Sequence, residues 1–510
     1  MTDYTWNSSS STSWNTAGNW NPNGVPGVDD KAIFNSTSTV NCSMDVPGGT
    51  HEVGDVDIQS GYTGDVSQAY TLKVQDSGAG DGKLSIAAGS WSTTSVLHAK
   101  EIDVKTGGTL NLNGTVNAYI KTNFTVSGTV NSHNSTLQLG AASVGSTTAA
   151  NFNDTLGDGT WNISGTTVNH YAGGGGNTLL NSATFGTNTA TWNMTLGTND
   201  LRTHIFPTGS KLHYLNMIAS GSSTGGITLA ERQQEFDMLK IGDGLTYKFD
   251  DNTTSGKVLV VGSGASLSAG TSADDDSRYC LRVGTGSTLD MSPCDYLGNI
   301  HICVSGAIFR SGSTFKAPKA IYRFQNYSNT NAVGGPYGET GGGNYTFEHN
   351  EGLISITGGG VHSRGGTWAW TSASGSMTKG NLYDFSPNGG SCQLGPTNAH
   401  FCENNVYMDN SSNLNKYGVT LPGSGYLYME GCPNFTVLGN FYQAANVRTL
   451  MTRSTAATLN VSGTIFIDDS SGTEGIFLRD TTSNAISTIN CGGIVNNCTT
   501  TNKGIKETRT

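Results

Sequence analysis

Apolar and polar residues alternate in short runs along this chain, and glycine interrupts the runs at recurring positions. Four such runs align with one another, at residues 240–245, 260–265, 282–287 and 303–308. A second short run follows each glycine, so the predicted unit is a strand, a glycine turn, a second strand and a loop. The aligned apolar residues, which follow one another by 20, 22 and 21 positions, are Ile241, Val261, Val283 and Val304.

A second group of sequence words has a shorter spacing. Residues 110–117 (LNLNGTVN) are followed after 14 positions by residues 124–131 (FTVSGTVN), and similar words occur at 161–168 and 459–466. Alternation with a period of two predicts strands with one face turned inward. The glycine in each word can adopt the positive φ of a corner.

A unit of about 20 residues with two or three short strands cannot bury its apolar face alone. Stacked units can, because each strand then pairs with its equivalent in the next unit. We therefore predict an all-β protein built as a stacked-strand solenoid, with tandem β-sandwich domains as the alternative. The best helix candidate in the chain is residues 229–240 (LAERQQEFDMLK).

This pattern resembles the parallel β-helix proteins, which include phage tailspikes and fibres, autotransporter passengers and pectate-lyase-like enzymes. Residues 14–34 (WNTAGNWNPNGVPGVDDKAIF) are similar to the opening of many such passengers and virion proteins. The resemblance covers that segment and the general style of the rest. It implies a right-handed parallel β-helix, and it points to an architecture rather than to a function.

Changes in composition suggest a division of the chain. Residues 1–50 are expected to cap the first coil and to act as an attachment segment, and residues 51–325 form the predicted solenoid body. Glycine-rich and aromatic residues at 326–400 predict long loops or an insertion, 401–500 return to strands, and 501–510 form a tail.

The attachment segment contains three tryptophans, Trp6, Trp14 and Trp20. Tryptophan is enriched at the buried anchors of interfaces, so we expect these side chains to hold an assembly. The resemblance to phage fibres favours a homotrimer. The alternative is that all three side chains pack on the first coil, where an open solenoid end needs cover.

Composition and charge narrow the possible functions. Charged residues make up 13% of the chain and the net charge is −11, whereas nucleic-acid binding needs a basic face, so no nucleic-acid partner is expected. No run of about 18 apolar residues occurs, so no membrane span is expected. The N-terminus lacks a basic segment and an apolar stretch, which indicates either folding in the cytosol or a signal already removed.

Nine cysteines are present, an odd number with irregular spacing and no CxxC pair. This pattern predicts neither a disulfide framework nor a zinc site. We expect most or all of the thiols to be reduced, as small buried apolar groups. Free thiols suit a protein that folds in a reducing cytosol.

Two further motifs have structural explanations. The word VGSGAS at 261–266 is similar to part of a dinucleotide fingerprint, but GxG recurs at 242 and 284, which indicates a turn repeated in each coil. The acidic residues Asp274, Asp275 and Asp276 offer carboxylates for calcium, the one cofactor that the sequence leaves open; a solvated loop tip is the alternative. Asp29 and Asp30 are expected to cap turns.

One group of residues in the glycine-rich region has the composition of a catalytic or glycan-binding site. Glycosidases use two carboxylates about 5–10 Å apart, and aromatic faces stack on sugars. The alternative is that these are plain surface residues, which are common in glycine-rich loops. We assign no catalytic residue and predict that the group binds a glycan without cutting it. The group comprises Glu348, His349, Glu351, His362, Arg364, Trp368 and Trp370.

These features together favour a non-enzymatic structural protein on the surface of a bacteriophage virion, as capsid decoration or as a tail fibre or spike. Such a protein would fold in the host cytoplasm and contact other virion proteins, and its aromatic loops would contact a surface glycan. The first alternative is a polysaccharide depolymerase or lyase on the same scaffold. The second is a secreted, adhesin-like passenger at the cell surface.

Overall fold

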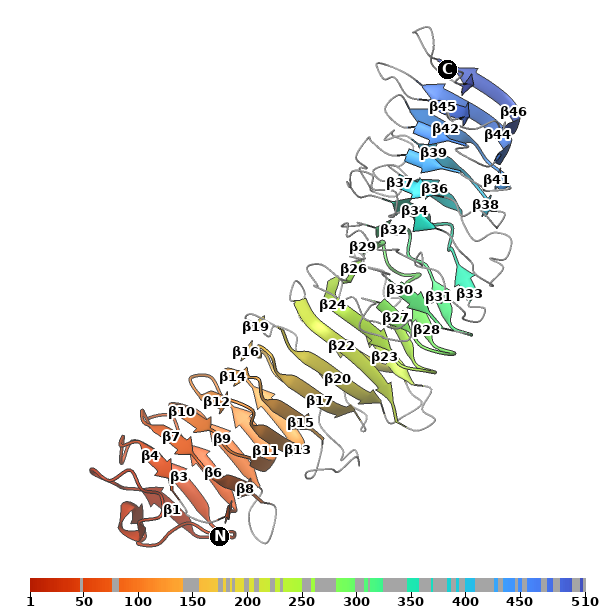
Figure 1. Cartoon of the computed structure of the whole chain (residues 1–510). Coiled ribbons are helices and arrows are strands. Elements are labelled where there is room, and N and C mark those ends of the chain that lie inside the picture. Colours follow the sequence, from red (N-terminus) through yellow and green to blue (C-terminus); the bar gives the residue numbers. More distant parts are fainter. Residues whose placement is uncertain are drawn as a thin grey trace. The chain divides into compact units, whose positions relative to one another are not determined.

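Strands make up nearly all of the regular structure in this computed structural model (Figure 1). Besides strands, the described residues contain one turn of 3-10 helix, η1 (Ala17–Asn19). The structure describes residues 1–45, 49–75, 82–140, 156–172, 178–179, 184–185, 189–196, 201–205, 211–220, 225–229, 233–249, 258–261, 281–298, 307–310, 312–323, 346–356, 368–369, 383–386, 391–393, 400–408, 426–429, 434–444, 448–451, 456–468, 475–479, 487–497 and 505–507.

The chain forms two compact units, Met1–Gln234 and Glu235–Thr510. In the N-terminal unit, sheet A contains β1 (Asp3–Trp6), β2 (Trp20–Asn21), β3 (Lys31–Phe34), β5 (Thr50–Val53), β6 (Asp55–Ile58), β8 (Thr71–Val74), β9 (Lys83–Ile86), β11 (Leu97–Val104), β13 (Asn117–Val126), β15 (Thr136–Leu139), β17 (Thr167–Ala172), β20 (Thr191–Leu196) and β22 (Lys211–Ala219). Sheet B contains β4 (Cys42–Met44), β7 (Asp65–Gln68), β10 (Ser90–Thr93), β12 (Thr109–Asn113), β14 (Thr129–His133), β16 (Thr160–Asn162) and β19 (Thr184–Phe185). Sheet C contributes β18 (Thr178–Leu179), β21 (Leu201–Ile205) and β23 (Gly226–Leu229).

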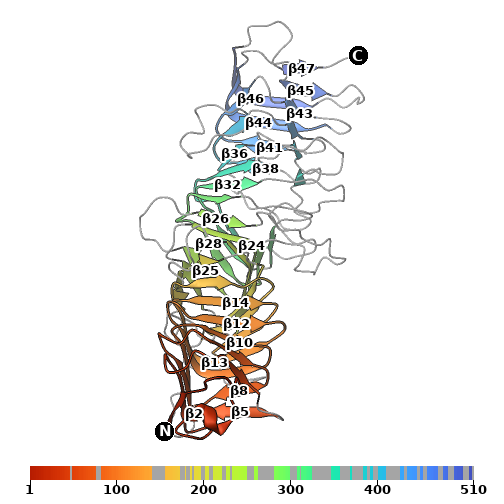
Figure 2. The same cartoon turned by 90° about the vertical axis from the view of Figure 1, so that its left-hand side faces the viewer.

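The chain of this unit passes repeatedly between sheets A and B, and each strand pairs in parallel with its equivalent in the next coil (Figure 2). The pairing of β1 with β2 is antiparallel. One strand of sheet A spans two neighbours: β11 pairs with β8 at Leu97–Ala99 and with β9 at Glu101–Val104. All-β architecture with stacked parallel strands is therefore confirmed.

Inward-facing side chains form continuous rows through the N-terminal unit. In sheet B the aligned residues are all 1% exposed or less, and side chains of different size together fill the interior. This row comprises Cys42, Val66, Trp91, Leu110, Val130 and Trp161.

Outward-facing asparagines form hydrogen-bonded ladders along the same strands. The Asn131 side-chain amide donates to Oδ1 of Asn111 at 2.7 Å, and Asn162 donates to Asn131 at 2.7 Å. Asn193 and Asn216 continue the same device in sheet A of this unit, donating to Asn169 and Asn193. The polar face of the strands is therefore braced from coil to coil by side chains as well as by the backbone.

The coil length differs from the spacing that the shorter sequence words predict. Leu110 lies beside Val130 in sheet B, whereas Phe124 lies in sheet A beside Ile102. The shorter step therefore links two different faces of the solenoid. Coil length also varies, because the aligned residues Ser90, Thr109, Thr129 and Thr160 are 19, 20 and 31 positions apart.

The C-terminal unit has the same parallel pairing. Its part of sheet A contains β26 (Val258–Val261), β27 (Leu281–Val283), β29 (Tyr296–Gly298), β30 (Ala307–Phe309), β32 (Ala320–Arg323), β34 (Leu353–Ile356), β36 (Asp384–Ser386), β38 (His400–Cys402), β39 (Val406–Met408), β41 (Phe435–Val437), β42 (Phe441–Ala444), β44 (Thr458–Asp468) and β46 (Thr488–Asn496). Its part of sheet C contains β25 (Thr246–Phe249), β28 (Thr288–Asp290), β31 (Thr314–Lys316) and β33 (Thr346–Glu348). Sheet D contains β35 (Trp368–Ala369), β37 (Ser391–Gln393), β40 (Tyr426–Tyr428), β43 (Arg448–Leu450), β45 (Ile476–Arg479) and β47 (Ile505–Glu507).

The predicted stacking of four aligned apolar residues is correct for one pair only. Ile241 and Val283 are directly paired, fully buried neighbours on parallel strands. Val261 lies on β26, which pairs with β29 instead, and the next partner of Val283 is Phe309. Val304 is outside the described residues. The predicted step therefore corresponds to only part of a coil here, because β25 and β26 lie between Ile241 and Val283 along the chain.

The predicted helix at 229–240 is wrong. Residues Gln233–Ile241 form β24, in which Phe236, Leu239 and Ile241 are buried. Helix-forming residues such as glutamate and glutamine have only weak local preferences, and pairing within the sheet overrides them.

Candidate functional site

The predicted glycan-binding group is only partly within the described residues. Glu348 ends β33, and His349 and Glu351 lie in the turn that leads into β34. Trp368 lies in β35, where the backbone alone is described, and His362, Arg364 and Trp370 are outside the described residues. Glycan binding by this group stays a prediction.

His349 is fixed by contacts on both of its ring nitrogens. The backbone N–H of Glu351 donates to Nδ1 at 2.9 Å, so Nε2 carries the proton and donates to Oε2 of Glu403 at 3.1 Å. The ring also stacks on Tyr383, with centroids 5.5 Å apart. Because neither nitrogen is left over, this histidine orders the turn and offers no free base to a substrate.

The turn itself explains the local sequence HNEG. Asn350 and Glu351 have φ values of 49° and 51°, and the Gly352 N–H donates to the His349 carbonyl at 2.9 Å. A Cβ on Gly352 would come within 2.6 Å of the Pro318 carbonyl oxygen, so glycine is required there.

Glu348 belongs to a ladder of alternating charge. Lys248, Asp290, Lys316 and Glu348 are aligned on four consecutive parallel strands of sheet C in the C-terminal unit. Lys316 Nζ lies 3.7 Å from Oδ2 of Asp290. Each charge therefore has an opposite charge on the neighbouring strand, which favours parallel pairing in this register.

The three N-terminal tryptophans lie inside their own unit, as the packing alternative has it. Trp6 and Trp14 are fully buried and Trp20 is 2% exposed, and their rings meet edge to face at 4.8–5.1 Å. Trp6 Nε1 donates to the Val40 carbonyl and Trp20 Nε1 to the Trp14 carbonyl. The three tryptophan rings therefore present no free surface to a partner chain.

Asp30 closes the adjacent turn by accepting the Gly27 N–H at 3.0 Å, as predicted.

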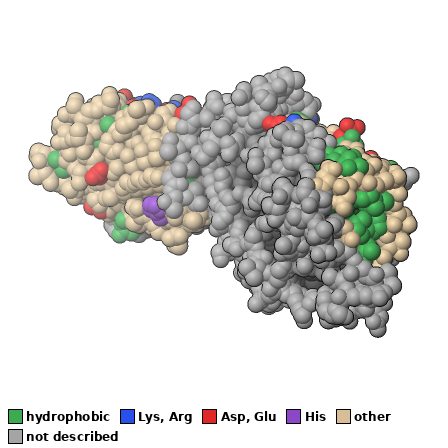
Figure 3. All heavy atoms as spheres, turned by 90° about the horizontal axis from the view of Figure 1, so that it is seen from above, with side chains coloured by type: hydrophobic (Ala, Val, Ile, Leu, Met, Phe, Trp, Pro, Cys, Tyr) green, Lys and Arg blue, Asp and Glu red, His purple; other side chains and the backbone are tan. Residues whose placement is uncertain are grey.

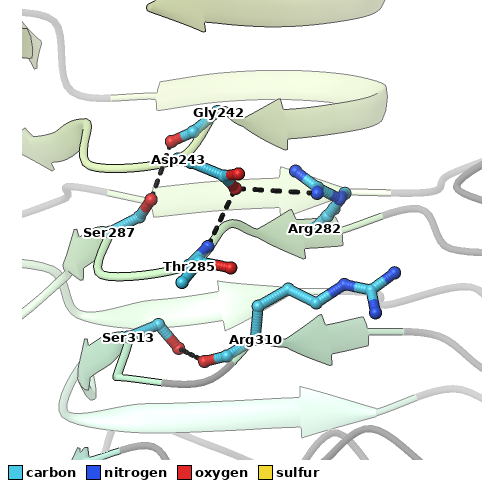
Figure 4. A network of polar contacts seen from close by, with 7 residues as sticks. All are labelled: Gly242, Asp243, Arg282, Thr285, Ser287, Arg310 and Ser313. Carbon is cyan, nitrogen blue, oxygen red and sulfur yellow. Dashed lines mark hydrogen bonds and ion pairs between the residues drawn. The ribbon is translucent and has the colours of Figure 1, made fainter. Parts of the chain in front are cut away.

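The GxG words at 242 and 284 are stacked corners (Figure 4). Asp243 Oδ1 accepts the Thr285 N–H at 2.9 Å and lies 3.7 Å from Arg282. Ser287 Oγ donates to the Gly242 carbonyl at 2.7 Å. The glycines that follow in each corner, Gly244 and Gly286, have φ values of 74° and 65°, which confirms a turn at these two words. Of the word at 261–266, only Val261 is among the described residues.

A charged hollow on the first coils was not predicted from the sequence. It lies on sheet A of the N-terminal unit, over β3, β6, β9 and β11, and has about 480 Å³ of empty space including its open mouth. The lining residues are Lys31, Asp55, Val56, Asp57, Lys83, Ser85 and Lys105. The words K-x-I at 31–33, D-x-D at 55–57, K-x-S at 83–85 and E-x-D at 101–103 are aligned on these strands, but unequal coil lengths hide the alignment in the sequence.

The predicted calcium ligands and the cysteines are only partly within the described residues. Asp274, Asp275 and Asp276 lie outside it, and within it no group of three or more His, Cys, Asp or Glu is placed to hold a metal ion. Cys42, Cys294, Cys402 and Cys491 are free thiols. Burial raises the pKa of Cys42 and of Cys402 well above the ordinary value, so both stay protonated at neutral pH.

No helix among the described residues has the length and apolar character to cross a membrane. Comparison with known proteins adds no relatives: the chain matches no family model, no curated protein and no solved structure.

Proposed function

We propose that this chain is a non-enzymatic structural protein on the surface of a large extracellular assembly, and that a bacteriophage virion is the assembly that fits best. In this proposal the stacked strands wind as a right-handed parallel β-helix. The protein would serve as capsid decoration or as a tail fibre or spike, folded in the host cytoplasm and bound to other virion proteins.

The observation that carries the proposal is the use of polar side chains to brace the stack. Asparagine ladders run through the N-terminal unit, and Asn460 and Asn490 form another in the C-terminal unit. The charge ladder ending at Glu348 and the corner at Asp243 use ionic groups in the same way. A surface whose polar groups bond to one another suits a rigid particle component exposed to solvent.

Two further observations agree with a virion protein. The four described thiols are free, as expected of folding in a reducing compartment. A net charge of −11 favours solubility at high copy number. A homotrimer is part of the proposal, and light scattering of the purified chain would measure its mass directly.

The experiment that tests the proposal is the location of the protein in infected cultures. Intact particles would be purified by density gradient, labelled with antibody against the chain and viewed by electron microscopy. Quantitative mass spectrometry would then give copies per particle. We expect surface labelling at a fixed copy number, whereas recovery of the chain only from the soluble fraction would refute the proposal.

A polysaccharide depolymerase is the second candidate, because the Glu403 carboxylate accepts the hydrogen bond of His349, and Glu348 and Glu351 flank that histidine in the sequence. The chain would be incubated with host capsular polysaccharide, and new reducing ends or unsaturated uronates would be measured. Activity that disappears in Glu403→Gln or Glu351→Gln, with unchanged circular dichroism, would favour this candidate over the structural one.

A further inference from the structure

Strand β46 has one edge that no other described strand pairs with. Its other edge pairs in parallel with β44, from Thr488 opposite Thr458 to Asn496 opposite Ile467. A free edge offers backbone N–H and C=O groups to any further strand, and proteins usually protect such an edge with charged residues or proline. β46 contains neither, so its edge is open to pairing.

The inward side of β46 ends two rows of apolar side chains. Cys491 and Ile494 are aligned with Val461 and Ile465 on β44. Ile465 is fully buried because β46 lies over it, whereas Ile494 is 51% exposed. One more strand alongside β46 would bury Ile494 as β46 buries Ile465.

The N-terminal unit shows how this fold closes an end with a strand of opposite direction. There β1 pairs in parallel with β3 on one edge and antiparallel with β2 on the other. In the antiparallel pair Trp6 lies opposite Trp20, and both side chains are buried. An antiparallel strand is therefore compatible with the terminal coil of the stack.

The bend of β46 restricts which strand can lie along it. The strand follows one part of β44 up to Val461 and another from Thr464 onward, with an irregularity between them, and Gly492 and Gly493 stand at this bend. A second copy of β46, running antiparallel, follows the bend when its own bend lies opposite. Gly492 of one copy then faces Gly493 of the other.

The two sides of the strand also agree in this register. Cys491 faces Ile494 of the second copy, and both residues point inward. Asn490 faces Val495, and both point outward. Opposite residues of an antiparallel pair lie on the same face, so the strand is complementary to itself. A shift of one residue that set Asn490 against Ile494 would break this agreement.

The charge distribution favours a second copy as well. The chain has a net charge of −11, which opposes the approach of two copies, but β46 carries no charge. Two copies can therefore meet along this strand without like charges between them. A two-fold contact needs only one self-complementary surface, which β46 provides.

We propose that the open edge of β46 binds the same edge of a second copy of this chain, as an antiparallel pair with a two-fold axis at Gly492 and Gly493. The inference goes beyond the proposed function and does not depend on a place in a virion. A trimer held by another surface would become a hexamer through this contact.

The mass of the full chain would be measured by light scattering and sedimentation velocity between about 1 and 100 µM. We expect the mass to double as the concentration rises. Ile494→Glu should weaken this association at least about tenfold, because pairing would bury a carboxylate without a partner. Its melting temperature at the lowest concentration should match that of the unchanged chain, since the side chain is exposed before pairing.

Leu438→Glu is the matched control. Leu438 is 45% exposed in the same unit, but it lies between β41 and β42 and not on the open strand. The same new charge at this position should leave the association unchanged.

A disulfide would test the register. With oxidised glutathione as the oxidant, the cysteine introduced by Ile494→Cys should join Cys491 of the second copy, because directly opposite residues are close enough for a disulfide. Peptide mass spectrometry would identify the pair. Adding Cys491→Ser should remove the covalent dimer.

Three results would overturn the proposal. The first is a mass that does not double over this concentration range. The second is an equal loss of association in Ile494→Glu and Leu438→Glu, which would indicate unspecific apolar contact. The third is a covalent dimer of Ile494→Cys that persists after Cys491→Ser. None of these results bears on surface labelling of particles, so the proposed function is tested separately.

Discussion

The strands that lie outermost in the two units differ in how they are covered. In the N-terminal unit, β1 pairs with both β2 and β3, and three tryptophans fill the space inside with exposures of 2% or less. In the C-terminal unit, β46 pairs with β44, its one partner among the described strands. Ile494 and Val495 on β46 are 51% and 40% exposed.

Figure 3 shows the consequence at the surface. Tan atoms dominate the described part of the N-terminal unit, while a green hydrophobic patch lies on the right-hand side, where β44 and β46 are drawn in Figure 1. β46 also lacks charged residues and proline, the groups that usually protect a strand edge.

Burial in this fold comes from the next strand as well as from the residue itself. Ile465 on β44 and Ile494 on β46 are aligned and point the same way, yet Ile465 is fully buried. The burial of an inward residue therefore depends on whether a further strand covers it. Four experiments test this difference between the covered and the open strands.

The largest effect is expected from Trp14→Ala in the covered end. Removing a fully buried indole should lower the free energy of unfolding by about 3–5 kcal/mol, measured by denaturant titration with circular dichroism. The matched variant Ile494→Ala, at the exposed position, should cost under about 1 kcal/mol. Equal losses from the two variants would contradict the difference between the two ends.

Glycine-to-alanine changes should divide in the same way. A Cβ at Gly463 on β44 would overlap Oδ1 of Asn440 and the Gly439 carbonyl oxygen, whereas one at Gly493 on β46 would meet Thr464 at an ordinary 3.5 Å. We expect Gly463→Ala to cost about 1–3 kcal/mol and Gly493→Ala to be nearly neutral. Thermal melts of both variants would show it, and a larger shift for Gly493→Ala would refute the assignment of β46 as open.

A smaller effect is expected from the asparagine ladders. Asn131 both donates to Asn111 and accepts from Asn162, so Asn131→Ala should cost about 1–2 kcal/mol. Asn490 is exposed and donates to Asn460 alone, so Asn490→Ala should cost a few tenths. The denaturant midpoints of the two variants would be compared. Similar shifts would contradict the expected dependence on burial and on the number of ladder hydrogen bonds.

The smallest effect should come from pH. Burial lowers the pKa of His51, whose ring lies edge to face with Trp14, and burial also lowers the pKa of His98. The unfolded chain therefore takes up protons more readily, so stability is full above the ordinary value of about 6.5 and falls as pH drops below it. Hydrogen exchange would be measured at pH 7.5 and 5.5. The protection of β5 should fall at the lower pH, whereas that of β46, which contains no acidic, basic or histidine side chain, should not change. His51→Gln should reduce the difference.

The sequence was sufficient for the strand class and the parallel stacking, because alternation and corner glycines are local signals. It was insufficient for register. Val261 and Val283 look equivalent in sequence, but the insertion of a further strand places them in different rows. The hollow at Ser85 was missed for the same reason, since Asp57, Ser85 and Asp103 are brought together only by coils of unequal length. The tryptophans suggested an interface because sequence alone does not show which side of a strand is covered.

Variable coil length has a consequence for how this chain tolerates change. Asn131 and Asn162 are 31 positions apart in the sequence, whereas Asn111 and Asn131 are 20 apart, yet all three asparagines are hydrogen-bonded in one row. The additional chain thus leaves the strand register undisturbed. Peptides inserted between neighbouring ladder positions should therefore be tolerated without a shift in register, which makes the scaffold suitable for presenting foreign sequence at defined intervals.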